Sequence, residues 1–172
     1  MEIRYGSLCR SRISLVNLFV YNGLVEASET MANAGQATLQ LDVVTPTRLV
    51  VSERVTEVVA PGSEGYFGVL PDHIPFITTL KAGVLTYWTG KEEHHLAVAR
   101  GYAEVRGDRL SILADAAEAA EEIDVARAER ARERAERRLE EWASGSDSVD
   151  IARAQAALRR ALARLEVVGK SH

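Results

Sequence analysis

Cysteine and histidine are scarce in this sequence of 172 residues. A single cysteine, Cys9, excludes an intramolecular disulfide framework and a site with several thiolate ligands. Of the four histidines, His94 and His95 are adjacent in a predicted strand and would point to opposite faces, and His73 has no second ligand nearby in the sequence. We therefore predict no metal site and no catalytic constellation.

Long apolar runs are also missing. Residues 13–25 are apolar but are interrupted by Asn17 and Asn22, and they are shorter than the roughly 20 residues of a membrane-spanning helix. Arginines before this run give it a weak likeness to a signal peptide. The favoured interpretation is that residues 1–36 are a disordered extension, or that the working start is Met31.

No strong excess of one charge is present, because the net charge is −4. In residues 123–142, six arginines are balanced by six acidic residues, which argues against a nucleic-acid partner. Residues 149–172 differ, with five basic residues against two acidic ones. This local excess suits either an acidic or phosphate-bearing partner or an ordinary solvated helix face.

All four prolines fall between residues 46 and 75, inside a region of short alternating segments. Glycine-rich turns separate these segments, and residues 62–68 lack both the Lys-Ser/Thr ending and the following helix of a phosphate loop. We predict an antiparallel, barrel-like β-sandwich over residues 37–115. Its nine strands are expected at 39–43, 48–52, 54–60, 65–70, 75–80, 84–89, 93–99, 101–105 and 109–114.

Residues 116–172 are predicted to form an antiparallel two-helix hairpin, which makes the chain an α+β protein. Apolar residues recur at spacings of three and four along two stripes, formed by Ala128, Ala131, Ala135, Leu139 and Trp142 and by Ile151, Ala154, Leu158, Ala161 or Leu162, and Leu165. Asp147 or Ser148 is the expected N-cap of the second helix. Because an alanine methyl contributes less than about 1 kcal/mol on burial, this hairpin should be weakly held.

Asp124 and Arg127 lie at the start of the first helix, three residues apart. An antiparallel hairpin would bring Arg160 and Arg164 to the same end. Arginine side chains suit phosphate oxygens, and a carboxylate can accept from an exocyclic amine. The alternative is an acidic helix start with a local ion pair and no ligand.

Several motifs at matching spacing resemble the epsilon subunit of bacterial F-type ATP synthase. The resemblance covers residues 39–167 and leaves residues 1–36 outside it. Its motifs are Val55-x-x-Val58-x-x-Pro61-Gly62-x-x-Gly65-x-x-Gly68-Val69-Leu70-Pro71-x-His73-x-Pro75, then Leu80-x-x-Gly83-Val84-Leu85, Ala99-x-Gly101-Tyr102-Ala103-Glu104-Val105 and Ile112-Leu113-Ala114-Asp115-x-Ala117-Glu118.

The resemblance implies a regulatory ATP site in the hairpin, with ATP as a ligand and no cofactor. The family's motif Ile-Asp-x-x-Arg-Ala matches residues 123–128, so the implied ATP-binding residues are Glu118, Ile123, Asp124, Arg127, Arg160 and Arg164. The implied contacts with the gamma subunit and the c-ring are Val69, Leu70, Pro71, His73 and Pro75.

The resemblance also implies a non-catalytic rotor subunit at the cytoplasmic face of the cell membrane, bound peripherally and without a transmembrane segment. Such a subunit helps to couple proton translocation to rotation and ATP synthesis. Its helices lie folded on the sandwich, or extend along gamma toward the alpha/beta ring and inhibit ATP hydrolysis. The competing interpretation is a structural adaptor whose sandwich binds a partner and whose hairpin binds no ligand.

Overall fold

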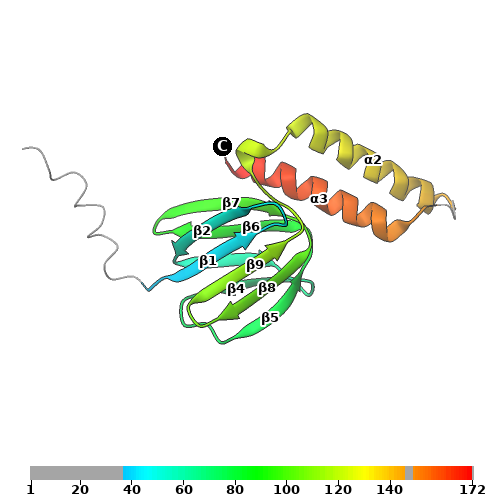
Figure 1. The fold of residues 1–172 in the computed structure, drawn as a ribbon. Helices are drawn as coiled ribbons and strands as arrows, with labels where there is room; N and C mark the ends of the chain where they lie inside the picture. Colours follow the sequence, from blue (N-terminus) through cyan, green and yellow to red (C-terminus); the bar gives the residue numbers. More distant parts are fainter. Residues whose placement is uncertain (1–36, 146–148, 172) are drawn as a thin grey trace, which may run out of the picture. The chain divides into compact units, whose positions relative to one another are not determined.

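The computed structural model describes residues 37–145 and 149–171, which contain ten strands and two long helices (Figure 1). Nine of the strands overlap the predicted ones, although the second ends at Val55, inside the range 54–60 that was predicted for the third. The strands are β1 (Leu39–Val44), β2 (Leu49–Val55), β3 (Glu57–Pro61), β4 (Tyr66–Val69), β5 (Phe76–Leu80), β6 (Gly83–Thr89), β7 (Glu92–Val98), β8 (Gly101–Arg106), β9 (Arg109–Ala114) and β10 (Ala117–Ala119).

The strands form two five-stranded sheets, in the orders β2-β1-β9-β8-β5 and β10-β7-β6-β3-β4. The pairing is antiparallel, as predicted, with one exception: β1 and β9 run parallel. The tenth strand, β10, was not predicted. It pairs with β7, so the second sheet extends to Ala119, beyond residue 115 where the sequence analysis divided the chain.

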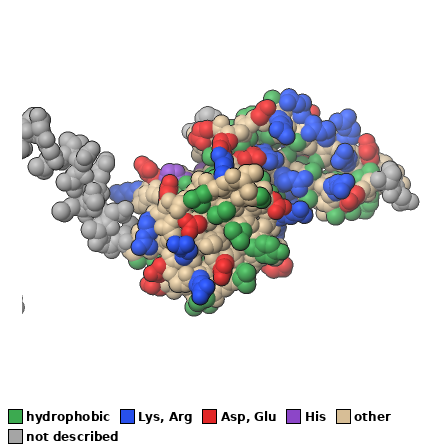
Figure 2. All heavy atoms as spheres, viewed as in Figure 1, with side chains coloured by type: hydrophobic (Ala, Val, Ile, Leu, Met, Phe, Trp, Pro, Cys, Tyr) green, Lys and Arg blue, Asp and Glu red, His purple; other side chains and the backbone are tan. Residues whose placement is uncertain are grey.

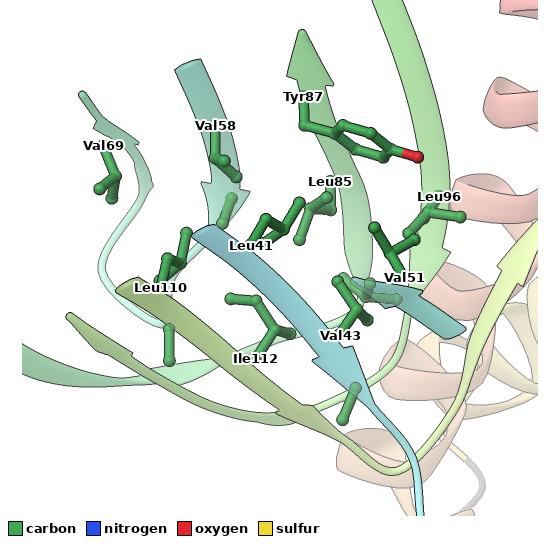
Figure 3. Packing of buried hydrophobic residues seen from close by; sticks show 14 of the residues in the cluster. Leu41, Val43, Val51, Val58, Val69, Leu85, Tyr87, Leu96, Leu110 and Ile112 are labelled. Carbon is green, nitrogen blue, oxygen red and sulfur yellow. The ribbon is translucent and has the colours of Figure 1, made fainter. Parts of the chain in front are cut away.

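The inward faces of the two sheets meet in one apolar core (Figure 3). In β1 the alternation predicted from sequence is visible directly, because Leu39, Leu41 and Val43 are buried and their neighbours are not. These residues meet Leu85 and Leu96 from the opposite sheet. The sandwich thus has its own core, which does not include the helices.

The chain leaves β10 through a single 3₁₀ turn, η1 (Ala120–Glu122), and then forms α2 (Val125–Ala143) and α3 (Ile151–Lys170). Each helix begins with an aspartate that accepts a hydrogen bond from a backbone N–H in the first turn, Asp124 for α2 and Asp150 for α3. The prediction that Asp147 or Ser148 caps the second helix is therefore wrong. Both of those residues lie outside the described part of the chain.

The two helices pack along the predicted alanine seam, and α3 rests on β6 and β7 (Figure 1). Ala128 and Ala135 of α2 are buried, as are Ala154 and Ala161 of α3, whereas Leu162 is 45% exposed. Of the two alternatives in the second stripe, Ala161 is therefore the seam residue. A second apolar cluster joins α3 to the sheet through Val84, Ala97, Ile123, Ala128, Ala163 and Val167.

His94 and His95 point to opposite faces of β7, as predicted. His94 stacks on Tyr87, with ring centroids 4.9 Å apart, and His95 lies 3.1 Å from the Thr86 hydroxyl. No group of metal-binding side chains occurs in residues 37–145 and 149–171. Within the same residues, neither helix has the length and apolar character needed to cross a bilayer.

Candidate functional site

Glu118 and Arg164 join the sandwich to the hairpin through two hydrogen bonds. Strand β10 places Glu118 at the sheet edge, where its Oε2 and Oε1 accept from Nε and Nη2 of Arg164 at 2.6 and 2.8 Å. This two-pronged hydrogen bond lowers the pKa of Glu118 and raises that of Arg164, against the opposite effect of burial on both. Both side chains are about 30% exposed, so solvent screens the pair only in part.

Glu122 fixes the segment that connects β10 to α2. Its Oε2 accepts from Arg48 Nη2 at 2.6 Å and from the backbone N–H of Ala119 at 3.2 Å. The hydrogen bond from Arg48 is the main reason that the pKa of Glu122 is lowered. The connection is thereby tied to the β1–β2 turn of the sandwich.

Asp124 and Ile123 have different roles, although they are neighbours in one motif. Asp124 is the N-cap of α2, and its Oδ1 accepts from the backbone N–H of Arg127 at 2.9 Å. Its second carboxylate oxygen accepts no hydrogen bond from the described residues. Ile123 is buried in the cluster between α3 and the sheet, so it positions the motif and does not line the cavity described next.

A cavity of about 420 Å³ lies between the two helices and the connecting segment. We call it the hairpin cavity. Five alanines line it, together with charged side chains from three elements: Glu118, Glu122 and Asp124 from the connection and its borders, Arg127, Arg134 and Arg138 from α2, and Arg160 and Arg164 from α3.

The structure therefore brings together five of the six residues predicted to bind ATP, with Ile123 behind them. Sequence reasoning missed Glu122, Arg134 and Arg138. The two arginines follow Arg127 by seven and eleven residues, so they share its helix face, and this periodicity is the signal that could have found them.

Positive charge exceeds negative charge in the hairpin cavity, because five arginines face three carboxylates. Glu118 and Glu122 already accept hydrogen bonds from Arg164 and Arg48. Within the described residues, Arg127, Arg134, Arg138 and Arg160 have no acidic partner at ion-pair distance. Such a cavity attracts anions, and its alanine walls leave space for a flat apolar group. Figure 2 shows the concentration of Lys and Arg side chains over the hairpin.

The segment predicted to contact other subunits lies at the edge of the sandwich. Val69 is fully buried in the core, so it supports this segment from inside. Leu70 is 55% exposed and Pro75 is also exposed, whereas Pro71 and His73 are half-buried. The His73 ring lies 2.8 Å from the carbonyl oxygen of Ile74.

A row of exposed apolar side chains continues from this segment across the outer face of the first sheet. Ile74 and Ile77 are more than two-thirds exposed, and Tyr102 and Leu113 are more than half exposed. Tyr102 and Leu113 are direct partners across β8 and β9. Figure 2 shows hydrophobic side chains grouped on this side of the sandwich. A surface of this kind is typical of a protein–protein interface.

Two family models match this chain, and together they span nearly all of its described part. One describes the beta-sandwich domain of the ATP synthase Delta/Epsilon chain and matches residues 38–120. The other describes the long alpha-helix domain of the same chain and matches residues 121–169. The chain belongs to the ATP synthase delta/epsilon family.

Curated relatives agree with this assignment. The ATP synthase epsilon chain of Syntrophobacter fumaroxidans is 58% identical over 103 residues, which is 60% of this chain and 77% of the relative. The protein of the same name from Moorella thermoacetica is 52% identical over 110 residues, covering 63% of this chain and 82% of the relative.

A solved structure shares the fold. It is a chain in a cryo-EM structure of the Euglena gracilis mitochondrial ATP synthase, with a TM-score of 0.65 and 24% sequence identity. The match covers 79% of this chain and 82% of that chain. The fold of this chain is thus also found in a chain of that ATP synthase structure.

Proposed function

We propose that this chain is a non-catalytic central-stalk subunit of an F-type ATP synthase that couples proton translocation to rotation and regulates ATP hydrolysis. In this proposal it binds peripherally at the cytoplasmic face of the membrane. ATP occupies the hairpin cavity and stabilises the folded hairpin. The extended hairpin reaches the alpha/beta ring and inhibits hydrolysis. Family membership supports the subunit assignment, and the hairpin cavity supports the regulatory part.

One observation carries the regulatory proposal: the hairpin cavity is built from both helices and from the connection to the sandwich. Arg127 comes from α2, Arg164 from α3 and Glu118 from β10, so the cavity exists only while all three elements are adjacent. A ligand shifts a conformational equilibrium by its difference in affinity for the two states. Any ligand of this cavity must therefore favour the folded hairpin.

The chemistry of the cavity suits a nucleoside triphosphate. The arginines without acidic partners, such as Arg127 and Arg160, can donate to phosphate oxygens. Asp124 keeps one carboxylate oxygen that can accept from an exocyclic amine or a ribose hydroxyl. Alanine walls give the base an apolar surface without filling the space that it needs.

In the extended state, Arg164 would lose the carboxylate of Glu118 and, with the other arginines of α3, could pair with acidic loops of the catalytic ring. The exposed apolar face of the sandwich, with Leu70 and Pro75 beside Ile77 and Tyr102, suits the gamma subunit and the c-ring as partners. Ile77 and Tyr102 lie on the first sheet, and Leu70 and Pro75 lie in the β4–β5 connection. Since α3 covers β6 and β7 of the second sheet, docking and hairpin opening can occur independently.

The test is calorimetric titration of the full chain with ATP, alongside Arg127→Ala and Arg130→Ala. Arg130 is an exposed arginine of the same helix that does not line the hairpin cavity. Loss of Arg127 should weaken ATP binding by about tenfold or more, the effect of removing a charge-assisted hydrogen bond, and loss of Arg130 should not. Equal titration curves for the wild type and Arg127→Ala would refute the ATP site.

A structural adaptor without a ligand is the second candidate. The apolar cluster around Val167 and the Glu118–Arg164 pair hold the hairpin on the sheet through contacts of the chain itself. Assembly with the gamma subunit in the absence of any ATP binding would favour this candidate.

A further inference from the structure

A second concave region lies between the sandwich and the first half of α3. We call it the α3 groove, and it encloses about 610 Å³. The β7–β8 turn contributes Arg100, the β9–β10 turn contributes Asp115, and α3 contributes Arg153 and Arg160. Four alanines form the rest of the lining. Charged and small apolar side chains thus border open space that no side chain of the described residues fills.

The charges in the α3 groove do not balance. Nε of Arg100 donates to Oδ2 of Asp115 at 2.5 Å, so the only carboxylate in the lining is already occupied. Arg153 and Arg160 have no acidic partner within residues 37–145 and 149–171. Two guanidinium groups therefore face the groove with their donors available.

Helix geometry places these two arginines on one wall. Arg153, Ala156 and Arg160 follow each other at spacings of three and four, and the rise between the two arginines is about 10 Å. Arg160 also lines the hairpin cavity, and it borders a small gap beside Ala97 and Ala99. It thus stands at the junction of the two concave regions.

We propose that the α3 groove binds a small phosphate-bearing anion, such as pyrophosphate, between Arg153 and Arg160. One guanidinium group can donate two parallel hydrogen bonds to two phosphate oxygens, and the small alanine side chains of the lining let the anion approach both arginines. The Arg100–Asp115 pair limits the affinity, because Asp115 repels the anion and holds the third arginine of the groove. This site does not depend on ATP binding in the hairpin cavity, although both sites use Arg160.

The experiment is calorimetric titration of the nucleotide-free full chain with pyrophosphate at constant ionic strength. Arg153→Ala should weaken binding about tenfold, the effect of losing one charge-assisted interaction. Asp115→Asn should strengthen binding severalfold, because it removes the repulsion and releases Arg100. Arg130→Ala, which changes neither region, should leave binding unchanged. The substituted side chains are exposed, so their replacement leaves the core intact, and circular dichroism of each variant checks the fold.

Three results would overturn the proposal. In the first, the wild type fails to bind pyrophosphate at millimolar concentration. In the second, Arg127→Ala abolishes binding while Arg153→Ala leaves it intact, a result that would place the anion in the hairpin cavity. Equal effects of Arg130→Ala and Arg153→Ala would show that only overall charge matters. ATP titration of the same variants is a separate readout. If ATP fails to bind while Arg153→Ala weakens pyrophosphate binding, the proposed ATP regulation is refuted and the anion site in the α3 groove is supported.

Discussion

Truncation of Val167 should release α3 from the sheet without unfolding the sandwich. Val167 is fully buried in the cluster with Val84, Ala97 and Ile123. Val167→Ala removes two methyl groups, worth about 1.6 kcal/mol by transfer, and the space left behind adds to this cost. Alanine favours a helix over valine by up to about 0.6 kcal/mol, which offsets a part. The net loss of about 1–2 kcal/mol is a change of roughly five- to thirtyfold in the docking equilibrium.

Leu162→Ala is the matched control for this change. It lies on the same helix and removes a larger side chain, but Leu162 is 45% exposed, so much of its apolar surface is already in water. Its truncation should shift docking less than that of Val167. If burial did not decide the cost, the larger deletion would have the larger effect.

Native-state hydrogen exchange measures this equilibrium directly. In Val167→Ala, the α3 amides should exchange about tenfold faster than in the wild type, while the amides of β9 in the sandwich core keep their rates. Equal acceleration in α3 and β9 would mean that the hairpin and the sandwich open as one unit. That result would refute the separate opening on which the regulatory proposal depends.

Three further predictions follow from individual contacts. Because the pKa of Glu118 is lowered in the folded protein, its pair with Arg164 stabilises docking fully above the ordinary value of 4.5 and loses this effect as the pH falls through the lowered pKa. After correction for the intrinsic exchange rate at each pH, the protection of the α3 amides should therefore fall in acid in the wild type, and Glu118→Gln should flatten that dependence. Asp124→Asn should change helix stability by no more than a few tenths of a kcal/mol, because asparagine is also a good N-cap, yet it should weaken ATP binding. Asp124→Ala should weaken ATP binding and also lower helix stability by about 1 kcal/mol, measured by thermal melting. Gly101→Ala should lower the melting temperature strongly, because its Cβ would collide with the β9 backbone, while Gly68→Ala, which has open space, should not.

Local sequence patterns predicted most of the fold because its strands are short, alternating and separated by turn residues. Strand β10 escaped detection since Ala117, Glu118 and Ala119 have no β-branched or aromatic side chain, and the strand is defined by its pairing with β7. The parallel pairing of β1 and β9 could not be predicted either, because it joins residues about seventy apart in the sequence and depends on register in the whole sheet.

The positions of the charged residues in the candidate site were predicted better than those of the buried residues. Helix spacing was enough to bring Arg160 and Arg164 near Asp124, since that follows from an antiparallel hairpin. Spacing could not show that Ile123 and Val69 face apolar clusters, because a motif gives residue type without direction. The hydrogen bond from Arg48 to Glu122 joins residues 74 apart in the sequence, and no local pattern can predict a contact at that separation.

Alanine in the helix seam accounts for the hairpin cavity and is also the reason that we expect the two helices to be weakly held together. Leucines in place of Ala128, Ala135 and Ala161 would each bury more apolar surface and hold the helices more firmly. The same leucines would occupy the space that the cavity needs, since all three alanines line it. A hairpin that keeps room for a ligand therefore gives up cohesion of its own. If the ligand is bound, it supplies the missing contacts, which is the condition under which ligand concentration can decide whether such a hairpin stays folded.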